Sequence, residues 1–554
     1  MTRQANPLSL SRGAQNRANR ALFCVPRPNV LIWAMFCFFA STASAAPPNA
    51  TYLFPAGAQR GTTVEVLVGG TFERWPVRVW SDDKGIVAKA HKDNGKLTVT
   101  VAADVLPGTH WLRLYDEEGA SALRPFIVGL LPEVMEQEPN DDPKKPQLLP
   151  ASQRTVNGRL EKPGDVDCFA VKLTKGQTLV ASLLANRVLG SPMDGILQVV
   201  SPEGFVLAEN NDYHDLDPQL VFAVPADGTY VVRLFAFPAT PDSAIRFAGA
   251  ETFIYRLTLT TGAFAEYAFP LAIPRANPGQ VELIGWNIPD TAKQVAVSVE
   301  TVFHPQFALP VRVRLEPHAC AVKSPPANRE RPQPIPLPVT VSGRLDVGEV
   351  DVYQFEAKKG QRLLFQVESR ELGFALDPTL RLTDAAGKML AQADDTGMSR
   401  DPELAYAVPQ DGTYRLEVRD LHGGGGLRYA YRLRATLAVP DYELTLAADR
   451  FVVTPGKTLE IPVTIERRNG FDGAVSIHVE GLPEGVSAAI MPATAKTAML
   501  KLTAAKGPLA SSFQVVGTVP GKDEWTRRAR AVLPGMNATT TQFWLTVAAA
   551  PTSK

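Results

Sequence analysis

The chain has 554 residues, of which 45% are hydrophobic and 21% are charged, the ordinary balance of folded globular domains. Its 57 basic and 57 acidic residues cancel, which argues against a nucleic-acid partner, because such a partner requires a strongly basic face. Forty-six prolines and 41 glycines, with no long helix-favouring segment, predict an all-β fold of several domains with short strands and many turns.

The first 45 residues have the three parts of a secretory signal. A basic region carries five arginines and no acid, residues 30–39 are apolar, and Ala43-Ser44-Ala45 suits cleavage. We predict a signal peptide over residues 1–45 and export to the periplasm, the cell surface or the medium. An uncleaved anchor helix is the alternative, although the apolar run is short for a span. The mature chain would have 52 basic and 57 acidic residues and no later segment apolar enough to cross a membrane.

Cleavage would remove Cys24 and Cys37 and leave Cys168 and Cys320. These two residues lie in different predicted domains, so we expect free thiols rather than a disulfide framework. Stability then depends on sandwich cores or on metal.

Residues 50–130 are predicted to form a small all-β domain. Apolar and polar residues partly alternate over residues 63–68, and turn signals such as Asn94-Gly95 separate the strand-like runs. The order of Phe54-Pro55, Arg60-Gly61 and a closing run at 126–129 resembles Ig-like domains of the IPT/TIG type, which implies a β-sandwich.

Residues 133–261 contain three motifs in a fixed order: Glu136-Gln137-Glu138-Pro139-Asn140-Asp141, Gly164-Asp165-Val166-Asp167-Cys168-Phe169 and Gly228-Thr229-Tyr230. Together the motifs resemble the bacterial pre-peptidase C-terminal (PPC) domain. This family of β-sandwiches includes relatives of the collagen-binding domains of clostridial collagenases. The resemblance implies an exported setting and association with peptidases or extracellular polymers.

Residues 339–437 are predicted to be a second PPC copy. Residues 341–345 repeat residues 156–160, and Gly412-Thr413-Tyr414 repeats Gly228-Thr229-Tyr230. The matching motifs lie 183–185 residues apart, which indicates a duplication.

The remaining segments complete an alternating architecture. Residues 265–323 are predicted to be Ig-like, because Phe269-Pro270 and the strand that follows echo the first domain. Residues 324–338 form a Pro-rich linker that is expected to be extended, and residues 440–549 resemble a third Ig-like domain. The order Ig-like, PPC, Ig-like, PPC, Ig-like resembles that of large exported proteins of planctomycetes.

The sequence contains no catalytic signature. It lacks the His-Glu-x-x-His and Gly-x-Ser-x-Gly motifs, and Gly423 to Gly426 lacks the Lys-Ser/Thr of a phosphate loop. A catalytic triad assembled in space remains an alternative, because its members need not be close in sequence. We expect no enzyme activity and no catalytic residue.

The acidic cluster is the candidate metal site. Calcium prefers six to eight oxygen ligands from carboxylates, amides and the backbone. Glu136 and Glu138 are two residues apart and point to one side of an extended segment, and Asp165 and Asp167 repeat this spacing. In the collagen-binding relatives an N-terminal linker folds onto an acidic turn to form a calcium site. That resemblance implies the ligands Glu136, Glu138, Asn140, Asp141 and Asp165, with Asp167 as a sixth.

A solvated acidic linker with a turn at Pro139-Asn140-Asp141 is the alternative interpretation. The second copy differs, because Arg329-Glu330-Arg331-Pro332 precedes it and Glu349 replaces Asp165. Calcium is therefore expected only in the first copy.

The sequence favours a secreted, non-catalytic, modular binding or adhesion protein, stabilised by calcium, whose ligand is an extracellular polymer, a glycan or a protein. No nucleic-acid partner and no membrane span after signal cleavage are expected. An accessory partner of a secreted peptidase and an unrecognised extracellular hydrolase are the alternatives. Four tryptophans are candidates for a ligand platform, although core packing is the favoured interpretation of each: Trp75, Trp80, Trp286 and Trp525.

Overall fold

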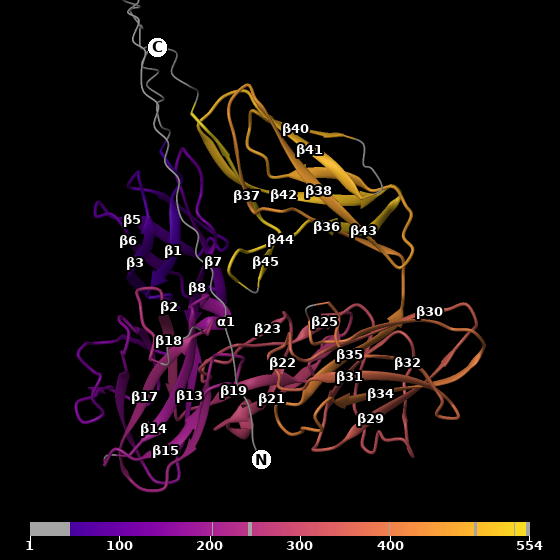
Figure 1. Cartoon of the computed structure of the whole chain (residues 1–554), viewed down its shortest axis with the longest axis horizontal. Coiled ribbons are helices and arrows are strands. Elements are labelled where there is room, and N and C mark those ends of the chain that lie inside the picture. The colour runs from indigo at the N-terminus through magenta and orange to yellow at the C-terminus, as the bar shows by residue number, and fades with distance from the viewer. Residues whose placement is uncertain are drawn as a thin grey trace, which may run out of the picture. The chain divides into compact units, whose positions relative to one another are not determined.

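The computed structural model describes residues 45–549 except 202, 242–245, 398, 492–495 and 537, and only the backbone of residues 522–524. The predicted signal peptide lies outside the described residues, apart from Ala45. The described chain is all-β, as predicted, and its one α-helix, α1 (Asn186–Leu189), has four residues (Figure 1). No helix in this part of the chain combines the length and apolar character that a membrane crossing needs.

The first domain is a sandwich of two four-stranded sheets. One has the strand order β1-β3-β6-β5 and the other β2-β8-β7-β4. Along β3, buried Val66 and Val68 alternate with exposed Glu65 and Leu67, the period-two pattern of a strand with one buried face. The strands are β1 (Asn49–Phe54), β2 (Gly57–Gln59), β3 (Thr63–Thr71), β4 (Arg78–Ser81), β5 (Ile86–Ala90), β6 (Lys96–Val101), β7 (Gly108–Tyr115) and β8 (Arg124–Gly129).

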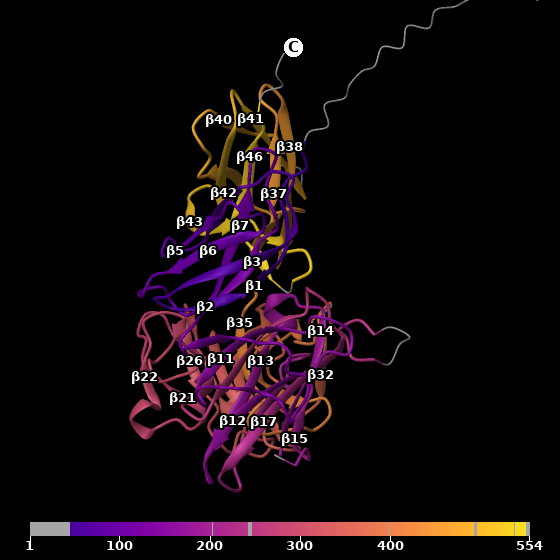
Figure 2. The same ribbon diagram turned by 90° about the vertical axis from the view of Figure 1, so that its left-hand side faces the viewer.

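The second domain, called here the first ten-stranded sandwich, has two five-stranded sheets. Their orders are β10-β12-β17-β14-β15 and β16-β13-β18-β11-β9, and Figure 2 shows β12 beside β17. Phe169 and Val171 of β12 share one buried core with Leu257 and Leu259 of the opposite sheet. The strands are β9 (Glu133–Met135), β10 (Gln147–Leu148), β11 (Arg154–Arg159), β12 (Asp167–Leu173), β13 (Thr178–Leu184), β14 (Met193–Val200), β15 (Val206–Asn210), β16 (Gln219–Ala223), β17 (Gly228–Pro238) and β18 (Ile254–Thr260).

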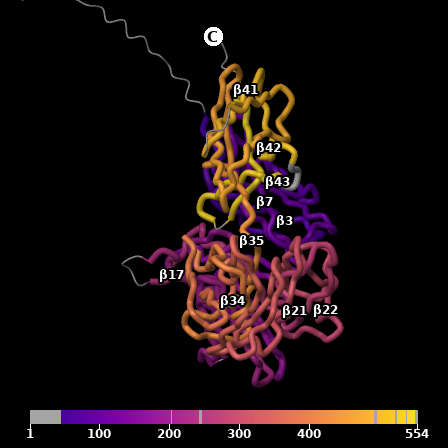
Figure 3. Tube along the Cα trace, turned by 90° about the vertical axis from the view of Figure 1, so that its right-hand side faces the viewer, coloured from indigo at the N-terminus to yellow at the C-terminus, as the bar shows by residue number. Residues whose placement is uncertain are grey.

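The third domain is smaller. It contains the sheet β19-β21-β22 and the strand pairs β20-β25 and β23-β24, and Figure 3 shows β21 beside β22. Phe307, Val281 and Leu283 lie in its core. Its elements are β19 (Phe264–Phe269), β20 (Ala272–Pro274), β21 (Gln280–Trp286), the 3-10 helix η1 (Asp290–Ala292), β22 (Gln294–Ala296), β23 (Thr301–Val302), β24 (Val311–Arg312) and β25 (Arg314–Glu316).

The second ten-stranded sandwich repeats the topology of the first. Its sheets, β27-β29-β34-β31-β32 and β33-β30-β35-β28-β26, correspond to the first pair strand for strand. The strands are β26 (Ala319–Val322), β27 (Gln333–Pro334), β28 (Val339–Arg344), β29 (Val350–Ala357), β30 (Arg362–Glu368), β31 (Pro378–Asp384), β32 (Met389–Ala393), β33 (Glu403–Ala407), β34 (Gly412–Asp420) and β35 (Ala430–Leu437).

The segment 324–338, expected to be an extended linker, lies against this second sandwich. The strand β26, just before the segment, pairs in parallel with β28 at the edge of one sheet. The strand β27, within the segment, pairs in parallel with β29 at the edge of the other sheet. Ala327 and Ile335 within it are buried. The sandwich therefore includes the residues that precede its first predicted strand.

The fifth domain pairs the sheet β36-β38-β41-β40 with β37-β46-β42-β39, and β43 pairs with β42. Ile461, Val463 and Ile465 alternate inward along β38. The strands are β36 (Asp441–Thr445), β37 (Arg450–Val453), β38 (Thr458–Arg468), β39 (Ser476–Glu480), β40 (Val486–Met491), β41 (Thr497–Ala504), β42 (Leu509–Val519), β43 (Lys522–Arg528), β44 (Ala531–Val532), β45 (Thr539–Thr540) and β46 (Phe543–Val547).

Candidate metal centre

A segment between β9 and β10 of the first ten-stranded sandwich carries four acidic residues. We call residues 136–142 the acidic strap. The amide of Glu136 donates to Asn157 O of β11 at 3.0 Å, and the amide of Cys168 in β12 donates to Asn140 O at 3.2 Å. Because β11 and β12 belong to opposite sheets, these bonds hold the strap across the end of the sandwich.

The strap brings five carboxylates together. One carboxylate oxygen from each of Glu136, Glu138 and Asp167 lies within 4.8 Å of the other two, and the same holds for Glu138, Asp141 and Asp165. Glu138 belongs to both groups. Asp165 and Asp167 are fully buried, whereas Glu138 and Asp141 face solvent. The cluster is thus closed on the sandwich side and open on the strap side.

Each of the more buried carboxylates is held by one oxygen only. The donors are the amide of Arg159 to Glu136 Oε2 (2.6 Å), the amide of Glu161 to Asp165 Oδ2 and the hydroxyl of Tyr255 to Asp167 Oδ2 (2.6 Å). The second oxygen of each carboxylate is buried and has no hydrogen-bond donor within reach among the described residues. These three free oxygens are therefore positioned before any ion binds.

Asn140 adds a buried amide to the cluster. Its side chain is buried, and both Oδ1 and Nδ2 lack a hydrogen-bond partner in the described part of the chain. Buried polar groups without partners are costly and rare in folded proteins. A nearby cation is Lys162, whose Nζ lies 3.7 Å from Asp165 Oδ1, but its side chain is 63% exposed. Oxygen atoms in this arrangement suit a hard cation such as calcium.

The pKa values of the buried carboxylates also favour a bound cation. Burial raises the pKa of Glu136 from 4.5 to about 7 and also raises the pKa of Asp165. Burial raises the pKa of Asp167 well above its ordinary value, and the charge of Glu136 adds to the effect. Without a cation, ionisation of these groups is therefore costly. A divalent cation would reverse this, because metal binding favours the deprotonated carboxylates.

All six residues that the sequence analysis named lie at this site. The structure brings together the carboxylates of Glu136, Glu138, Asp141, Asp165 and Asp167. Asn140 lies on the acidic strap next to Asp141, with a buried and unpartnered side chain. The geometry of these residues fits calcium, whose binding remains a prediction. Tyr255 also belongs to the site but carries no motif in the sequence. It contacts Asp167 from β18, on the opposite sheet, and only the fold brings the two residues together.

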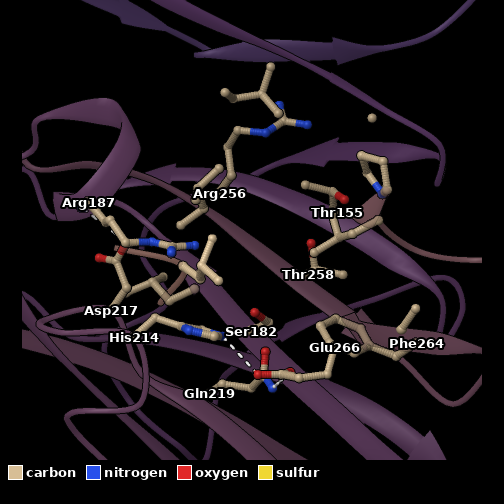
Figure 4. A pocket seen from close by; sticks show the side chains of 18 residues that line it. Thr155, Ser182, Arg187, His214, Asp217, Gln219, Arg256, Thr258, Phe264 and Glu266 are labelled. Atoms are coloured by element: carbon tan, nitrogen blue, oxygen red, sulfur yellow. Dashed lines mark hydrogen bonds and ion pairs between the residues drawn. The ribbon is translucent and has the colours of Figure 1, made fainter. Parts of the chain in front are cut away.

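A second feature is a cavity of about 170 Å³ beside α1 (Figure 4). Its lining includes Ser182, His214 and Glu266, the residue types of a hydrolase triad. Nε2 of His214 lies 3.3 Å from the Glu266 carboxylate, and Nδ1 lies 3.2 Å from Gly373 O. Both ring nitrogens are thus occupied, and neither is left to act as a base on Ser182. The geometry is that of a contact between domains.

The candidate platform tryptophans are half-buried. Trp75 packs edge-on against Phe72, and Trp286 packs against Phe264. Trp80 contacts the ring of Trp544, and Trp525 contacts Phe471. These contacts agree with the favoured interpretation of core packing.

Two segments of the chain, residues 165–236 and 349–420, match the family described as the bacterial pre-peptidase C-terminal domain. The chain carries two PPC domains. They lie in the two ten-stranded sandwiches, which we call the first and second PPC domains from here on. The predictions of an all-β chain and of a duplicated PPC domain are confirmed.

A probable subtilase-type serine protease of Deinococcus radiodurans is 31% identical over 141 residues. The match covers 25% of this chain and 18% of the protease, so it spans less than a fifth of that relative.

Solved structures that match part of the chain include the PPC domain of a collagenase from Bacillus anthracis. It is 22% identical, with a TM-score of 0.16, and the match covers 19% of this chain and 93% of that one. Immunoglobulin domains 1–4 of Sidekick-1 are 11% identical, with a TM-score of 0.21, over 91% of this chain and 98% of that one.

Proposed function

We propose that the protein is an exported, non-catalytic binding or adhesion protein whose first PPC domain is clamped by calcium. The observation that carries the calcium clamp is the set of buried oxygens without a hydrogen-bond donor on Glu136, Asp165 and Asp167, in carboxylates that converge with Glu138. Calcium would supply the positive charge that these groups lack.

The position of the strap gives the clamp a mechanical role. The strap begins seven residues after β8 of the first domain ends at Gly129. Between them, Glu133 of β9 forms an ion pair with Arg256 of β18 at 2.6 Å. Calcium would therefore fix the segment by which the chain passes from the first domain into the first PPC domain.

Binding rather than catalysis is supported by the organisation of the chain. Two PPC domains are combined with Ig-like sandwiches, and the cavity beside α1 has no free histidine nitrogen for catalysis. The partner would be an extracellular polymer, a glycan or a protein that contacts sandwich faces and loops. Fold alone does not fix which one.

The test of this function uses the mature chain, residues 46–554. Isothermal titration should show calcium binding, and Asp165→Asn should abolish it. Retention on immobilised extracellular polymers or a glycan array, in calcium and in chelator, should identify a ligand class. No retention on any polymer or glycan, together with hydrolysis of a peptide or ester library, would overturn the non-catalytic proposal.

A second candidate is an accessory partner of a secreted peptidase. It is favoured by the similarity to part of a probable subtilase-type protease. In that case the mature chain would bind an exported peptidase and change its stability or activity, while remaining inactive alone. Co-purification with a peptidase from the culture medium, without retention on polymers, would favour this candidate.

A further inference from the structure

The second PPC domain has a strap of its own, and strand register gives its position. In the first domain β9 pairs with β11 so that Met135 lies opposite Asn157. In the second domain β26 pairs with β28 so that Val322 lies opposite Ser342. Asn157 and Ser342 are equivalent, because each precedes the repeated Gly-Arg-Leu. The residues that follow Met135 and Val322 therefore begin equivalent straps.

The first residues of these straps are Glu136 and Lys323, and the two backbones are held alike. The amide of Glu136 donates to β11 at 3.0 Å, and that of Lys323 donates to β28 at 2.9 Å. Four residues on, amides of β12 and β29 donate to Asn140 O at 3.2 Å and to Ala327 O at 2.7 Å. We call residues 323–329 the second strap, which matches the acidic strap residue by residue.

The side chains of the two straps differ in charge. The acidic-strap residues Glu136, Glu138, Asn140, Asp141 and Asp142 correspond to Lys323, Pro325, Ala327, Asn328 and Arg329. The second strap therefore has no carboxylate at any of the four acidic positions. Its first residue has the opposite charge.

The ammonium of Lys323 reaches the place where the first domain has its free oxygens. Nζ lies 2.7 Å from Glu349 and 2.8 Å from Asp351 Oδ1 as ion pairs, and it donates to Arg344 O at 2.8 Å. The lysine side chain is only 8% exposed. Glu349 and Asp351 are the repeat counterparts of Asp165 and Asp167.

The carboxylates around the ammonium are anchored as in the first domain. Tyr431 donates to Asp351 Oδ2 at 2.5 Å, as Tyr255 does to Asp167. Burial opposes ionisation of Glu349, but the hydrogen bond and charge of Lys323 lower its pKa below the ordinary value. The same backbone site thus holds a buried lysine ammonium in the second copy, whereas the first copy has only the exposed Lys162, 3.7 Å from Asp165.

We propose that the Lys323 ammonium is a built-in replacement for the metal ion, so that the second PPC domain keeps its strap closed without calcium and retains a latent metal site beneath the lysine. This inference rests on the proposed calcium clamp of the first domain. A covalently attached cation is present at any calcium concentration, whereas a bound ion stabilises only in proportion to its concentration relative to Kd. Calcium depletion would therefore loosen one strap and leave the other closed.

The first experiment counts bound calcium on the mature chain by equilibrium dialysis. One variant restores the acidic strap in the second domain: Lys323→Glu, Pro325→Glu, Ala327→Asn and Asn328→Asp. We expect one ion on the wild type and two on the variant. One ion on the wild type and one on the variant would overturn the latent site but not the calcium clamp. No ion on the wild type overturns the calcium clamp; the latent site then stands if the variant gains an ion and fails if it does not.

The second experiment is the reciprocal one, and it needs a single substitution instead of four. Glu136→Lys places an ammonium in the first strap, and Glu136→Gln is its neutral control. In chelator, Glu136→Lys should melt several degrees above both the wild type and Glu136→Gln, and its melting temperature should not respond to calcium. A melting temperature in chelator no higher than that of Glu136→Gln would overturn the replacement of metal by ammonium.

Discussion

Tyr255 donates its hydroxyl hydrogen to Oδ2 of Asp167 at 2.6 Å from a fully buried position. This bond leaves Oδ1 of the same carboxylate buried and without a donor among the described residues. In the proposed calcium site the tyrosine would orient the ligand Asp167 without being a ligand itself, and outer groups of this kind tune metal affinity.

We expect Tyr255→Phe to weaken calcium binding by about 10-fold to 100-fold, because Asp167 loses the bond that orients it. Tyr431→Phe is the matched control, since Asp351 keeps the ammonium of Lys323. Titration calorimetry on both variants measures the effect. Equal calcium affinity in the wild type and Tyr255→Phe would show that the hydroxyl does not orient the ligand.

Removal of calcium should lower the melting temperature of the mature chain, and Asp165→Asn should abolish that response. The loss of one anchored oxygen leaves the remaining ligands too few for tight binding. The control is Asp212→Asn, which removes an exposed carboxylate of the same domain that lies outside the cluster. Differential scanning calorimetry with calcium and with chelator gives the two melting temperatures. An unchanged calcium response in Asp165→Asn would contradict the assignment.

The acidic strap could be predicted from sequence because its oxygens are concentrated in two short motifs. Glu136 to Asp141 and Asp165 to Asp167 are each nearly contiguous, and the resemblance to PPC domains joins them. The duplicated sandwich was equally visible, because turn motifs and strands recur at a nearly constant spacing.

The second strap could not be predicted in the same way. Its sequence keeps no acidic motif, and its equivalence to residues 136–142 depends on the parallel pairing of β26 with β28. Parallel register between an edge strand and its neighbour leaves no sequence signal of its own. The sequence pattern therefore places Lys323 at the end of the predicted Ig-like domain, residues 265–323. In the structure Lys323 forms ion pairs with Glu349 and Asp351 of the second PPC domain.

The pH dependence of calcium binding follows from Glu136. Its pKa is raised from 4.5 to about 7 in the folded, metal-free chain, chiefly by burial. The folded state then holds a proton that the unfolded state releases between these values, so metal-free stability falls as pH rises from 4.5 to about 7. Calcium binding at the proposed site would displace this proton, so calcium affinity should rise over the same window.

We expect the calcium-induced rise in melting temperature to be small at about pH 5 and large at about pH 8, on either side of the Glu136 titration. Glu136→Gln removes one titrating group and should weaken this dependence, while the raised pKa values of Asp165 and Asp167 keep part of it. Melting curves at several pH values, with calcium and with chelator, measure it. A calcium effect that is constant across the window would show that Glu136 does not take part in binding.

A buried ion pair joins residues that lie far apart in the sequence. Arg113 Nη2 of β7 in the first domain lies 2.6 Å from Asp449 Oδ2 of the fifth domain, and each side chain is 2% exposed. Burial lowers the pKa of Arg113, whereas the charge of Asp449 opposes this shift. Loss of one partner would leave the other charge buried and unpaired, which typically costs about 3–5 kcal/mol.

Arg113→Met should therefore destabilise the contact between the first and fifth domains strongly. The double variant Arg113→Met with Asp449→Leu should recover most of the loss, because replacement of a buried pair by apolar groups is often nearly neutral. Urea unfolding and limited proteolysis near residue 449 measure the two effects, and Arg78→Met is a control on an exposed arginine of β4. If Arg113→Met unfolds at the same urea concentration as the wild type, the ion pair does not hold the two domains together.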